Sequence, residues 1–265
     1  KRQSTEMYDS AAYFAGEVVN DQTTYGFQDN LLDIYDVENP NGKEHIFTMS
    51  MDRSGTSEGQ YSKISKMFIP YIDGATIYLK QGDTDKLIPS HDGWGEYQTT
   101  PEFYNSFDNN DKRKTQLFVN KVYRADGTVN AEYPGTLPYP FCRKYIDPQF
   151  DGDKTSTRPF LIRYSDVALI YAEAAGPTAK SYELVNYIRH RAGLSDLTPG
   201  LGVDEFRTAV IKERKYELAC EGDYMYDIRR TNKIQTIPEA QGLTQDQCAF
   251  YPIPQAEINL NGSLR

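Results

Sequence analysis

The chain has 265 residues, a formal net charge of -9 and 38% hydrophobic residues. This length and composition allow a sizeable buried core in one or two domains. An acidic chain without a basic block is a poor candidate for binding nucleic acid or an anionic membrane surface, so we expect neither partner. No apolar run is long enough to span a bilayer.

Cysteine and histidine, the usual ligands of structural metal sites, are few and scattered along the chain. They are Cys142, Cys220, Cys248, His45, His91 and His190. Their spacing matches neither a disulfide framework nor a zinc site. We therefore expect no metal site and no cofactor.

Residues 7–19 are the first predicted element, an amphipathic helix. Its apolar face consists of Ala11, Ala12, Phe14, Ala15, Val18 and Val19. Residues at this spacing share one side of a helix, and that side must pack against other helices to be buried. Residues 20–36 are predicted to form a turn and a short helix, and residues 44–49 a short strand.

The stretch from Tyr61 to Asp111 is rich in loops and in aromatic residues. The only tryptophan of the chain, Trp94, lies between Gly93 and Gly95, and glycines on both sides allow the backbone to turn and expose the indole. Two interpretations of Trp94 stay open, a platform for a sugar ring and a structural plug. Tyrosine also suits sugar rings, because it combines a flat apolar face with a polar tip, although we expect most of the 21 tyrosines to be packing residues.

Residues 115–123 and 129–133 are predicted to pair as a β-hairpin across the Asp126-Gly127 turn. A short acidic turn follows further along the chain. Its acids are Asp147, Asp151 and Asp153. Carboxylate oxygens can bind calcium, but this spacing does not match the EF-hand loop. We therefore expect a solvated turn and not a required metal site.

Two helices are predicted close together in the last hundred residues. In residues 164–175, apolar side chains recur at i, i+3, i+4, i+7 and i+8, and Gly176-Pro177 ends the pattern. A second apolar stripe covers residues 181–192, with Gly193 placed to cap the helix. Because the break between the two helices is short, we expect them to be antiparallel neighbours.

A third predicted helix begins at Asp204, as its N-cap, and runs to Gly222. Charged residues are dense in it and just after it: Glu213, Arg214, Glu217, Glu221, Asp227, Arg229 and Arg230. The three glutamates recur at i, i+4 and i+8, so they share one edge of the helix. Arginine pairs with carboxylates through a planar fork. We interpret the group as a structural ion-pair lattice that docks the helices, in preference to a catalytic carboxylate cluster.

A series of short motifs runs through this region. They are Arg163-Tyr164, Tyr171–Ala174, Ile188-Arg189, Arg191–Leu194, Glu213-Arg214, Glu217-Leu218, Glu221-Gly222, Asp227, Arg229-Arg230, Tyr251–Pro254 and Glu257-Ile258. Their order and spacing resemble the C-terminal region of the SusD/RagB family, surface glycan-binding lipoproteins of certain Gram-negative bacteria. The chain departs from the family pattern at Tyr224, where arginine is frequent, and at Thr231, where tryptophan is frequent.

The resemblance implies a mainly α fold, in which elements of a TPR-like α-α superhelix are combined with large irregular loop segments and short β-hairpins. It implies one unit over residues 1–265: residues 1–36 end the repeat-helix region, residues 37–160 are the loop-rich segment, and residues 161–265 are the helical C-terminal segment. It also implies that a full-length precursor has further N-terminal helices, a signal peptide and a lipidated cysteine that this chain lacks.

By the same resemblance, the chain is a binding protein and not an enzyme. It would capture an oligosaccharide at the cell-surface side of the outer membrane and deliver it to a SusC-like TonB-dependent transporter. Its membrane association would rest only on the N-terminal lipid anchor that is absent from this chain. Two alternatives stay open: a peptide-binding protein of the same family, and a glycoside hydrolase, which would need two carboxylates across a cleft.

Sugar contacts vary within the family and lie outside its motifs, so the candidate ligand-binding residues are chosen from their chemistry. A sugar platform needs aromatic faces flanked by amide, carboxylate and guanidinium groups. The candidates are Trp94, Tyr97, Tyr61, Tyr71, Tyr78, Asp52, Arg53, Asp92 and Asn105. No catalytic residue is expected.

Overall fold

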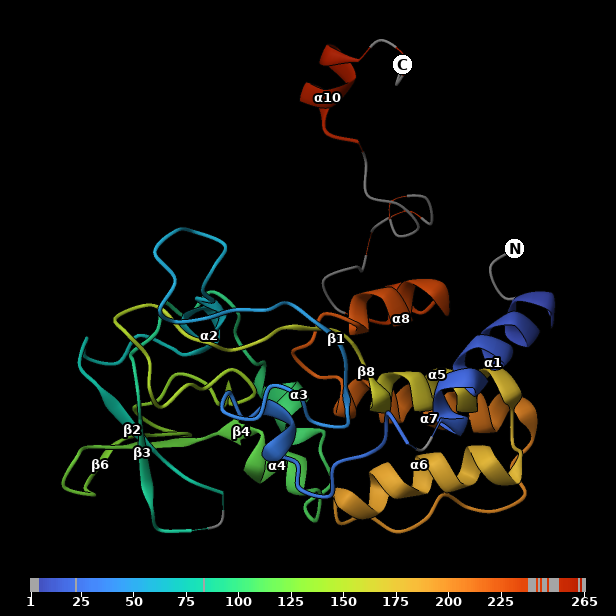
Figure 1. Ribbon diagram of the computed structural model, residues 1–265, viewed down its shortest axis with the longest axis horizontal. Helices are drawn as coiled ribbons and strands as arrows, with labels where there is room; N and C mark the ends of the chain where they lie inside the picture. Colours follow the sequence, from blue (N-terminus) through green and yellow to red (C-terminus); the bar gives the residue numbers. More distant parts are fainter. Residues whose placement is uncertain are drawn as a thin grey trace.

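The computed structural model describes residues 5–21, 23–82, 84–237 and 253–261, with Gly242, Thr244, Gln247 and Ser263. Cys248 and the Tyr251-Pro252 part of the closing motif lie outside these residues. The longer helices gather on one side of the molecule, and loops with small sheets and short helices form the other side (Figure 1). The mainly α fold class with large irregular segments is therefore confirmed.

Short helices and strands follow the first helix, and longer helices dominate the second half of the chain. The helices in chain order are α1 (Thr5–Asn20), η1 (Asp33–Tyr35), α2 (Ile64–Phe68), α3 (Pro101–Asn105), α4 (Lys112–Gln116), α5 (Tyr164–Ala175), α6 (Ala179–Arg191), α7 (Val203–Glu217), α8 (Tyr224–Arg230), η2 (Ile234–Thr236) and α10 (Gln255–Leu260). The strands are β1 (His45–Thr48), β2 (Ile77–Lys80), β3 (Leu87–Ser90), β4 (Phe118–Val119), β5 (Lys121–Tyr123), β6 (Val129–Glu132), β7 (Phe141–Cys142) and β8 (Phe160–Arg163). None of the helices within the described ranges is long and apolar enough to cross a membrane.

The apolar face of α1 packs against α5. Ala15 and Val19 of α1 share a buried cluster with Tyr164, Val167 and Ala168 of α5. The predicted helix and its need for helical partners are thus confirmed. Phe14 was assigned to the same face, but its side chain points away from this cluster and is 70% exposed.

A second cluster joins α5, α6 and α7 through side chains that include Leu169, Ile188 and Phe206. Gly176 ends α5 with φ +71°, a backbone conformation that favours glycine, as the sequence predicted. Helices α5 and α6 pack against each other as expected. Their packing sets the scaffold on which the charged side chains of α7 are placed.

The predicted ends of α7 are wrong at both termini. Gly202, and not Asp204, is the N-cap, and the carboxylate of Glu205 accepts a hydrogen bond from the Gly202 amide at 3.2 Å. The acid three residues after the cap therefore serves the helix start, which places Asp204 inside the first turn. The helix ends at Glu217, because the chain turns through left-handed conformations at Cys220 and Gly222 before α8.

The small sheets divide the predicted hairpin region. Strands β5 and β6 pair antiparallel across the Asp126-Gly127 turn, as predicted, within a sheet of order β3-β2-β5-β6. The first residues of the predicted first strand, before β5, do not join this hairpin. Asp111 is the N-cap of α4, because its carboxylate accepts a hydrogen bond from the amide of Arg113. Thr115 therefore lies in α4. The next strand, β4, pairs with β7. Strand β1 pairs antiparallel with β8 and so joins the loop-rich part to the start of α5.

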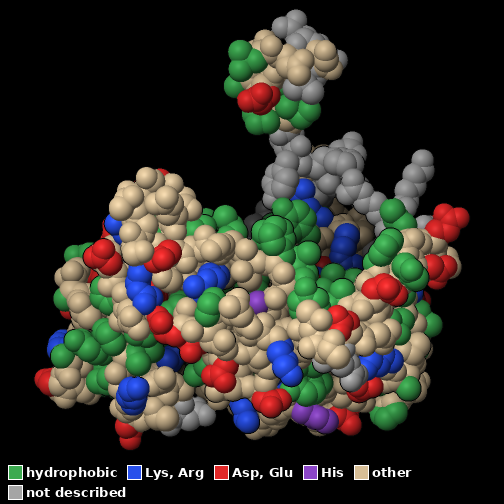
Figure 2. All heavy atoms as spheres, viewed as in Figure 1, with side chains coloured by type: hydrophobic (Ala, Val, Ile, Leu, Met, Phe, Trp, Pro, Cys, Tyr) green, Lys and Arg blue, Asp and Glu red, His purple; other side chains and the backbone are tan. Residues whose placement is uncertain are grey.

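Charged side chains of both signs are scattered over the face drawn in Figure 2, with hydrophobic side chains between them.

Candidate functional site

The loop that carries Trp94 lies against α2. The amide of Trp94 donates a hydrogen bond to the carbonyl oxygen of Lys66 at 2.7 Å, and the amide of Tyr97 donates to that of Met67 at 2.7 Å. These bonds tie both ends of a four-residue stretch to the same short helix. The backbone beneath Trp94 and Tyr97 is therefore fixed.

Both glycines beside Trp94 are required by close packing. A Cβ atom on Gly93 would lie 1.7 Å from the carbonyl oxygen of Ile69, a contact that no side chain tolerates. Gly95 has φ +69°, and a Cβ atom there would lie 2.6 Å from the hydroxyl oxygen of Tyr139. The glycines thus let the loop lie directly on its support, and they leave it little freedom to rearrange.

The Trp94 indole projects from this loop with 44% of its surface exposed. The ammonium group of Lys66 lies 5.2 Å from the ring centroid, close enough for a cation–π contact, and also forms an ion pair with Asp153. The indole is thus supported by one lysine at the surface and is not enclosed in the core. An exposed aromatic ring on a fixed backbone is suited to stacking against a flat ligand.

Asp92 supports the loop and does not point to solvent. Its carboxylate accepts hydrogen bonds from the amides of Ile72, Asp73, Gly74 and Gly93 at 2.6–3.0 Å, and the residue is buried. Its oxygens are occupied by the chain itself, which leaves them unsuited to a ligand. The same bonds hold the turn after Tyr71 beside the Trp94 loop, and the Tyr71 side chain is 68% exposed.

Arg53 is likewise engaged by the protein. Its guanidinium group donates to both carboxylate oxygens of Asp147 at 3.1 Å and to Glu38 at 3.0 Å. The Asp147 carboxylate is buried and also accepts from the amide of Ser156 at 2.7 Å. The expectation of a solvated turn is therefore wrong for Asp147, which anchors the turn. In the ranges that the structure describes, no three His, Cys, Asp or Glu side chains gather as a metal site.

The remaining candidates occupy separate places. Asp52 is exposed at a turn, and its pKa is lowered because the Ser54 amide donates to it. The hydroxyl of Tyr61 donates to Glu58 at 2.9 Å. Tyr78 is half-buried in β2, and Asn105 is exposed at the end of α3. The nine candidates thus do not form one site, and the exposed aromatic residues around the loop are Trp94, Tyr97 and Tyr71.

Tyr97 also lines a groove of about 720 Å³ beside the loop. Its walls come from α2, the Trp94 loop, α3, α7, the turn after α7, the start of α8 and the residue after η2. The lining residues are Phe68, Tyr97, Gln98, Thr99, Thr100, Glu102, Phe103, Lys215, Ala219, Cys220, Tyr224 and Ile237. Four of these residues are aromatic, and the charged residues among them are one lysine and one glutamate.

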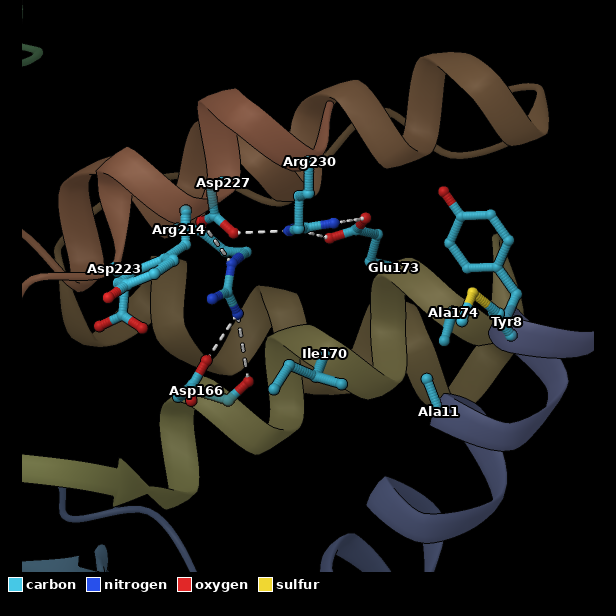
Figure 3. A pocket seen from close by; sticks show the side chains of 12 residues that line it. Tyr8, Ala11, Asp166, Ile170, Glu173, Ala174, Arg214, Asp223, Asp227 and Arg230 are labelled. Atoms are coloured by element: carbon cyan, nitrogen blue, oxygen red, sulfur yellow. Dashed lines mark hydrogen bonds and ion pairs between the residues drawn. The ribbon is translucent and has the colours of Figure 1, made fainter. Parts of the chain in front are cut away.

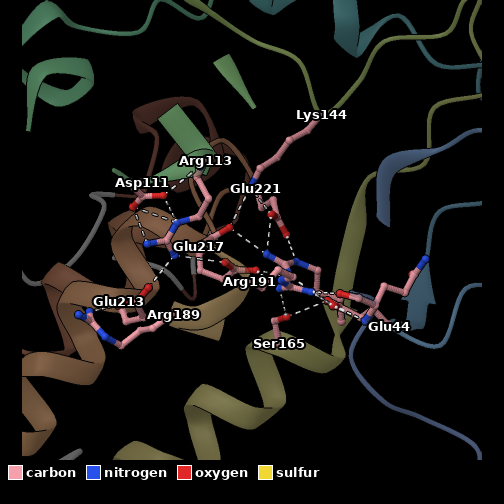
Figure 4. Close-up of polar contacts among 12 residues, drawn as sticks. Glu44, Asp111, Arg113, Lys144, Ser165, Arg189, Arg191, Glu213, Glu217 and Glu221 are labelled. Carbon is pink, nitrogen blue, oxygen red and sulfur yellow. Dashed lines mark hydrogen bonds and ion pairs between the residues drawn. The ribbon is translucent and has the colours of Figure 1, made fainter. Parts of the chain in front are cut away.

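A buried ion-pair network is built around another side chain of α7, that of Glu217 (Figure 4). Glu217 accepts from Arg191 at 2.7 Å, Arg163 at 3.0 Å and Arg113 at 3.3 Å. Burial alone would raise the pKa of Glu217, but the three guanidinium groups hold it well below its usual value. Glu217 is therefore ionised and fully occupied.

The network extends from Glu217 in two directions. Arg163 also binds Glu44 at 3.0 Å and Glu221 at 2.7 Å, which connects the residue before β1 with the turn after α7. On the other side, Glu213 accepts from Arg113 at 2.6 Å and from Arg189 at 3.0 Å. Further members are Asp111, Lys144 and Ser165. Side chains from α4, α5, α6 and α7 thus meet in one hydrogen-bonded group.

The other predicted charged residues form a second group on a different side of α7 (Figure 3). Arg214 donates to Asp166 and to Asp227, both at 2.7 Å, and Arg230 donates to Asp227 at 2.8 Å. They line a cavity of about 390 Å³ with Asp223, whose pKa is raised to about 6 by burial and by the nearby Asp166. Arg229 lies half-buried in α8.

The partners of the three glutamates lie far from them in the sequence. Arg191 precedes Glu217 by 26 residues and Arg113 precedes it by 104, so no helical period connects either of them with α7. The only signal in the sequence was the glutamate spacing itself. That spacing indicates that one edge of α7 carries carboxylates that require positively charged partners. It does not indicate which arginine or lysine residues supply them.

The model of the SusD family matches residues 116–265, more than half of the chain, and the chain therefore belongs to this family. The resemblance inferred from the motifs is confirmed. Among curated relatives, SusD-like protein P2 of Formosa agariphila is 34% identical over 131 residues, which cover 43% of this chain and 26% of P2.

Solved structures share the fold over nearly the whole chain. A SusD superfamily protein from Parabacteroides distasonis has a TM-score of 0.72 and 22% identity, over 98% of this chain and 56% of that one. Surface glycan-binding protein A from Bacteroides thetaiotaomicron, in complex with laminarihexaose, has a TM-score of 0.72 and 21% identity, over 98% and 59%. The chain thus spans less than two thirds of these proteins, and at this identity the likeness concerns the fold alone.

Proposed function

We propose that this chain binds a glycan without cleaving it, and that Trp94, with Tyr97 and Tyr71, forms the platform for the sugar rings. The observation that carries the proposal is the Trp94 loop itself. It presents an exposed indole on a backbone that is bonded to α2 and packed against Ile69. A rigid aromatic platform binds a flat sugar face with little loss of conformational entropy.

Family membership supports the same proposal, because a structural neighbour was solved with laminarihexaose bound. By extension we propose that the protein acts at the cell-surface side of the outer membrane, held there by a lipid anchor. There it would pass the glycan to a SusC-like TonB-dependent transporter.

A glycan array with the purified chain is the first test, followed by titration with the best ligand. Trp94 is the only tryptophan, so its fluorescence reports directly on the platform. We expect a change in emission that saturates with ligand, and weaker binding by Trp94→Ala. Tyr13→Ala, which removes a 64% exposed aromatic from α1, is the matched control and should bind normally. Binding without any change in emission would place the ligand elsewhere.

The proposal that the protein is not a hydrolase rests on the state of its acids. A general acid needs a raised pKa and access to the bond that breaks. Glu217 is held ionised by arginines. Asp223 has a raised pKa, but the carboxylates beside it, Asp166 and Asp227, are already ion-paired with Arg214. Release of reducing ends from a bound polysaccharide, above a heat-treated control, would contradict this.

Peptide binding is the second candidate, and the groove beside Tyr97 is the observation that favours it. Phe68, Phe103 and Tyr224 offer an apolar wall that suits hydrophobic side chains better than hydroxyl groups. A peptide library screened alongside the glycan array separates the two candidates, because Trp94→Ala should spare a ligand that occupies only the groove.

A further inference from the structure

Two cysteines from distant parts of the chain meet at the end of α7. Cys142 is the last residue of β7 and is buried, and Cys220 lies in the turn between α7 and α8. Cys220 packs against the buried cluster of Phe68, Cys142 and Tyr145. Both thiols are free in the structure.

The backbone around the two cysteines is held in a fixed position. The hydroxyl of Tyr145 donates a hydrogen bond to the carbonyl oxygen of Cys220 at 2.8 Å. The ammonium group of the neighbouring Lys144 donates to the carbonyl oxygen of Glu217 at 2.9 Å. The segment after β7 is thus bonded to the end of α7 beside the cysteine contact, which keeps the two thiols close together in the folded protein.

Cys220 has φ +67°, in the left-handed region that favours glycine. The neighbouring turn position, Gly222, also has a positive φ and does carry glycine. Cys220 thus carries a side chain in a backbone conformation that favours glycine. That side chain packs against the cluster that contains Cys142. Local backbone strain of this kind points to a role for the side chain.

Cys220 is the more accessible of the two cysteine residues. Cys220 lines the 720 Å³ groove and is half-buried, whereas Cys142 is 1% exposed. A small oxidant can therefore enter the groove and meet Cys220 first, with Cys142 behind it as the second thiol.

We propose that Cys142 and Cys220 are a dithiol that a small disulfide, such as oxidised glutathione, converts to an internal disulfide. The Cys220 thiolate attacks one sulfur of the reagent, forms a mixed disulfide and releases one glutathione thiolate. The Cys142 thiolate then attacks Sγ of Cys220, which closes the protein disulfide and releases the second glutathione thiolate. The two protons of the protein thiols end on the two glutathiones, so two thiols are oxidised and one disulfide is reduced.

The surroundings make this reaction slow. The hydrogen bond with Cys142 and burial raise the pKa of the Cys220 thiol well above its usual value, so the attacking thiolate is scarce at neutral pH. The test therefore uses an excess of oxidised glutathione and long incubation of the native chain, with a sample kept in dithiothreitol for comparison.

We expect the oxidised protein to lose two alkylatable thiols, and its digest to contain one crosslinked peptide that joins Cys142 to Cys220. The bridge should raise Tm by on the order of 5–10 °C, because it closes a long loop in the unfolded chain. Cys248→Ser is the matched control and should behave like the parent. Cys220→Gly removes the reachable thiol and suits the backbone, so it should fold and show neither the bridge nor the rise in Tm.

Three outcomes would overturn the proposal. All thiols could stay alkylatable after oxidation, or Cys220 could stop at the mixed disulfide with glutathione. The third is a bridge that includes Cys248 in the folded protein. Each is read from the same digest, and none depends on glycan binding.

Discussion

The network around Glu217 and the loop around Trp94 use polar and aromatic side chains in opposite ways. In the network, the carboxylates are bonded to guanidinium, ammonium or hydroxyl groups of the same chain, and the group is shielded from water. In the loop, the backbone is bonded just as firmly, but the indole of Trp94 and the ring of Tyr97 face solvent.

This difference separates what holds the fold from what can bind a ligand. A buried charge that already has its partners cannot bind anything else without breaking the protein. An exposed ring on a fixed backbone can bind a partner without any rearrangement. The dense charged residues of the sequence therefore stabilise the fold. The less conspicuous Gly93-Trp94-Gly95 turn carries the proposed binding surface.

The largest expected effect comes from breaking the network at its centre. Glu217→Ala leaves Arg163, Arg191 and Arg113 without their shared carboxylate, which should lower the free energy of unfolding by about 3–5 kcal/mol. Chemical denaturation measures this value. Glu183→Ala, which breaks the exposed i,i+3 pair with Lys180, is the control and should cost less than about 1 kcal/mol. Equal effects in the two variants would mean that burial of the network contributes nothing.

Low pH tests the same network without a mutation. The pKa of Glu217 is lower in the folded protein than its ordinary value of 4.5, so its contribution is present above pH 4.5 and is lost as pH falls below it. Urea unfolding at a series of pH values should show stability decreasing from pH 5 downward. A difference in stability between the parent and Glu217→Ala that stayed constant or grew from pH 5 to pH 3 would contradict this sign.

Gly93→Ala tests the rigidity of the loop. A Cβ atom 1.7 Å from the Ile69 carbonyl must displace the loop, and we expect a loss of about 1–3 kcal/mol in stability together with weaker glycan binding. Gly26→Ala adds a Cβ atom at ordinary van der Waals distance from Lys43 and is the control for both measurements. Loss of stability with full affinity would show that the platform does not depend on the position of the loop.

Asp223→Asn should have a smaller effect on stability than Glu217→Ala, and the opposite sign. Because burial raises the pKa of Asp223 to about 6 from an ordinary value of 3.8, its ionised form destabilises the folded protein at neutral pH. The amide should therefore raise the free energy of unfolding by about 1–2 kcal/mol at pH 7, and by less at pH 5, where the folded carboxyl is mostly protonated. A gain that is the same at both pH values would rule out titration as its cause.

The sequence predicted those parts of the molecule that depend on local periodicity. The stripes of α1, α5 and α6 follow from apolar spacing, and Gly176 ends α5 as expected. Local rules also explain the error at the start of α7, since the Glu205 carboxylate accepts from the Gly202 amide and the N-cap therefore lies two residues before the predicted cap, Asp204. The correct helix predictions and this error all depend on residues within one or two helical turns of each other.

The candidate site depended on contacts that sequence spacing does not reveal. Asp92 and Arg53 have the chemistry of ligand-binding residues, but the backbone amides around Gly74 and the buried Asp147 occupy them. Trp94 could be proposed from its glycine neighbours alone. Its support by Lys66 and Ile69, which decides that the ring is both exposed and fixed, comes from α2 and the residue after it, well before Trp94 in the chain.

The most direct test of the account measures affinity and melting temperature of Trp94→Ala side by side, with a glycan that the parent binds. Loss of the stacking ring should weaken binding by about 1–3 kcal/mol, whereas removal of a side chain that is 44% exposed should change stability by less than about 1 kcal/mol. Undiminished affinity, or a collapse in Tm with the affinity of the folded fraction preserved, would show that Trp94 belongs to the structure and not to the binding surface.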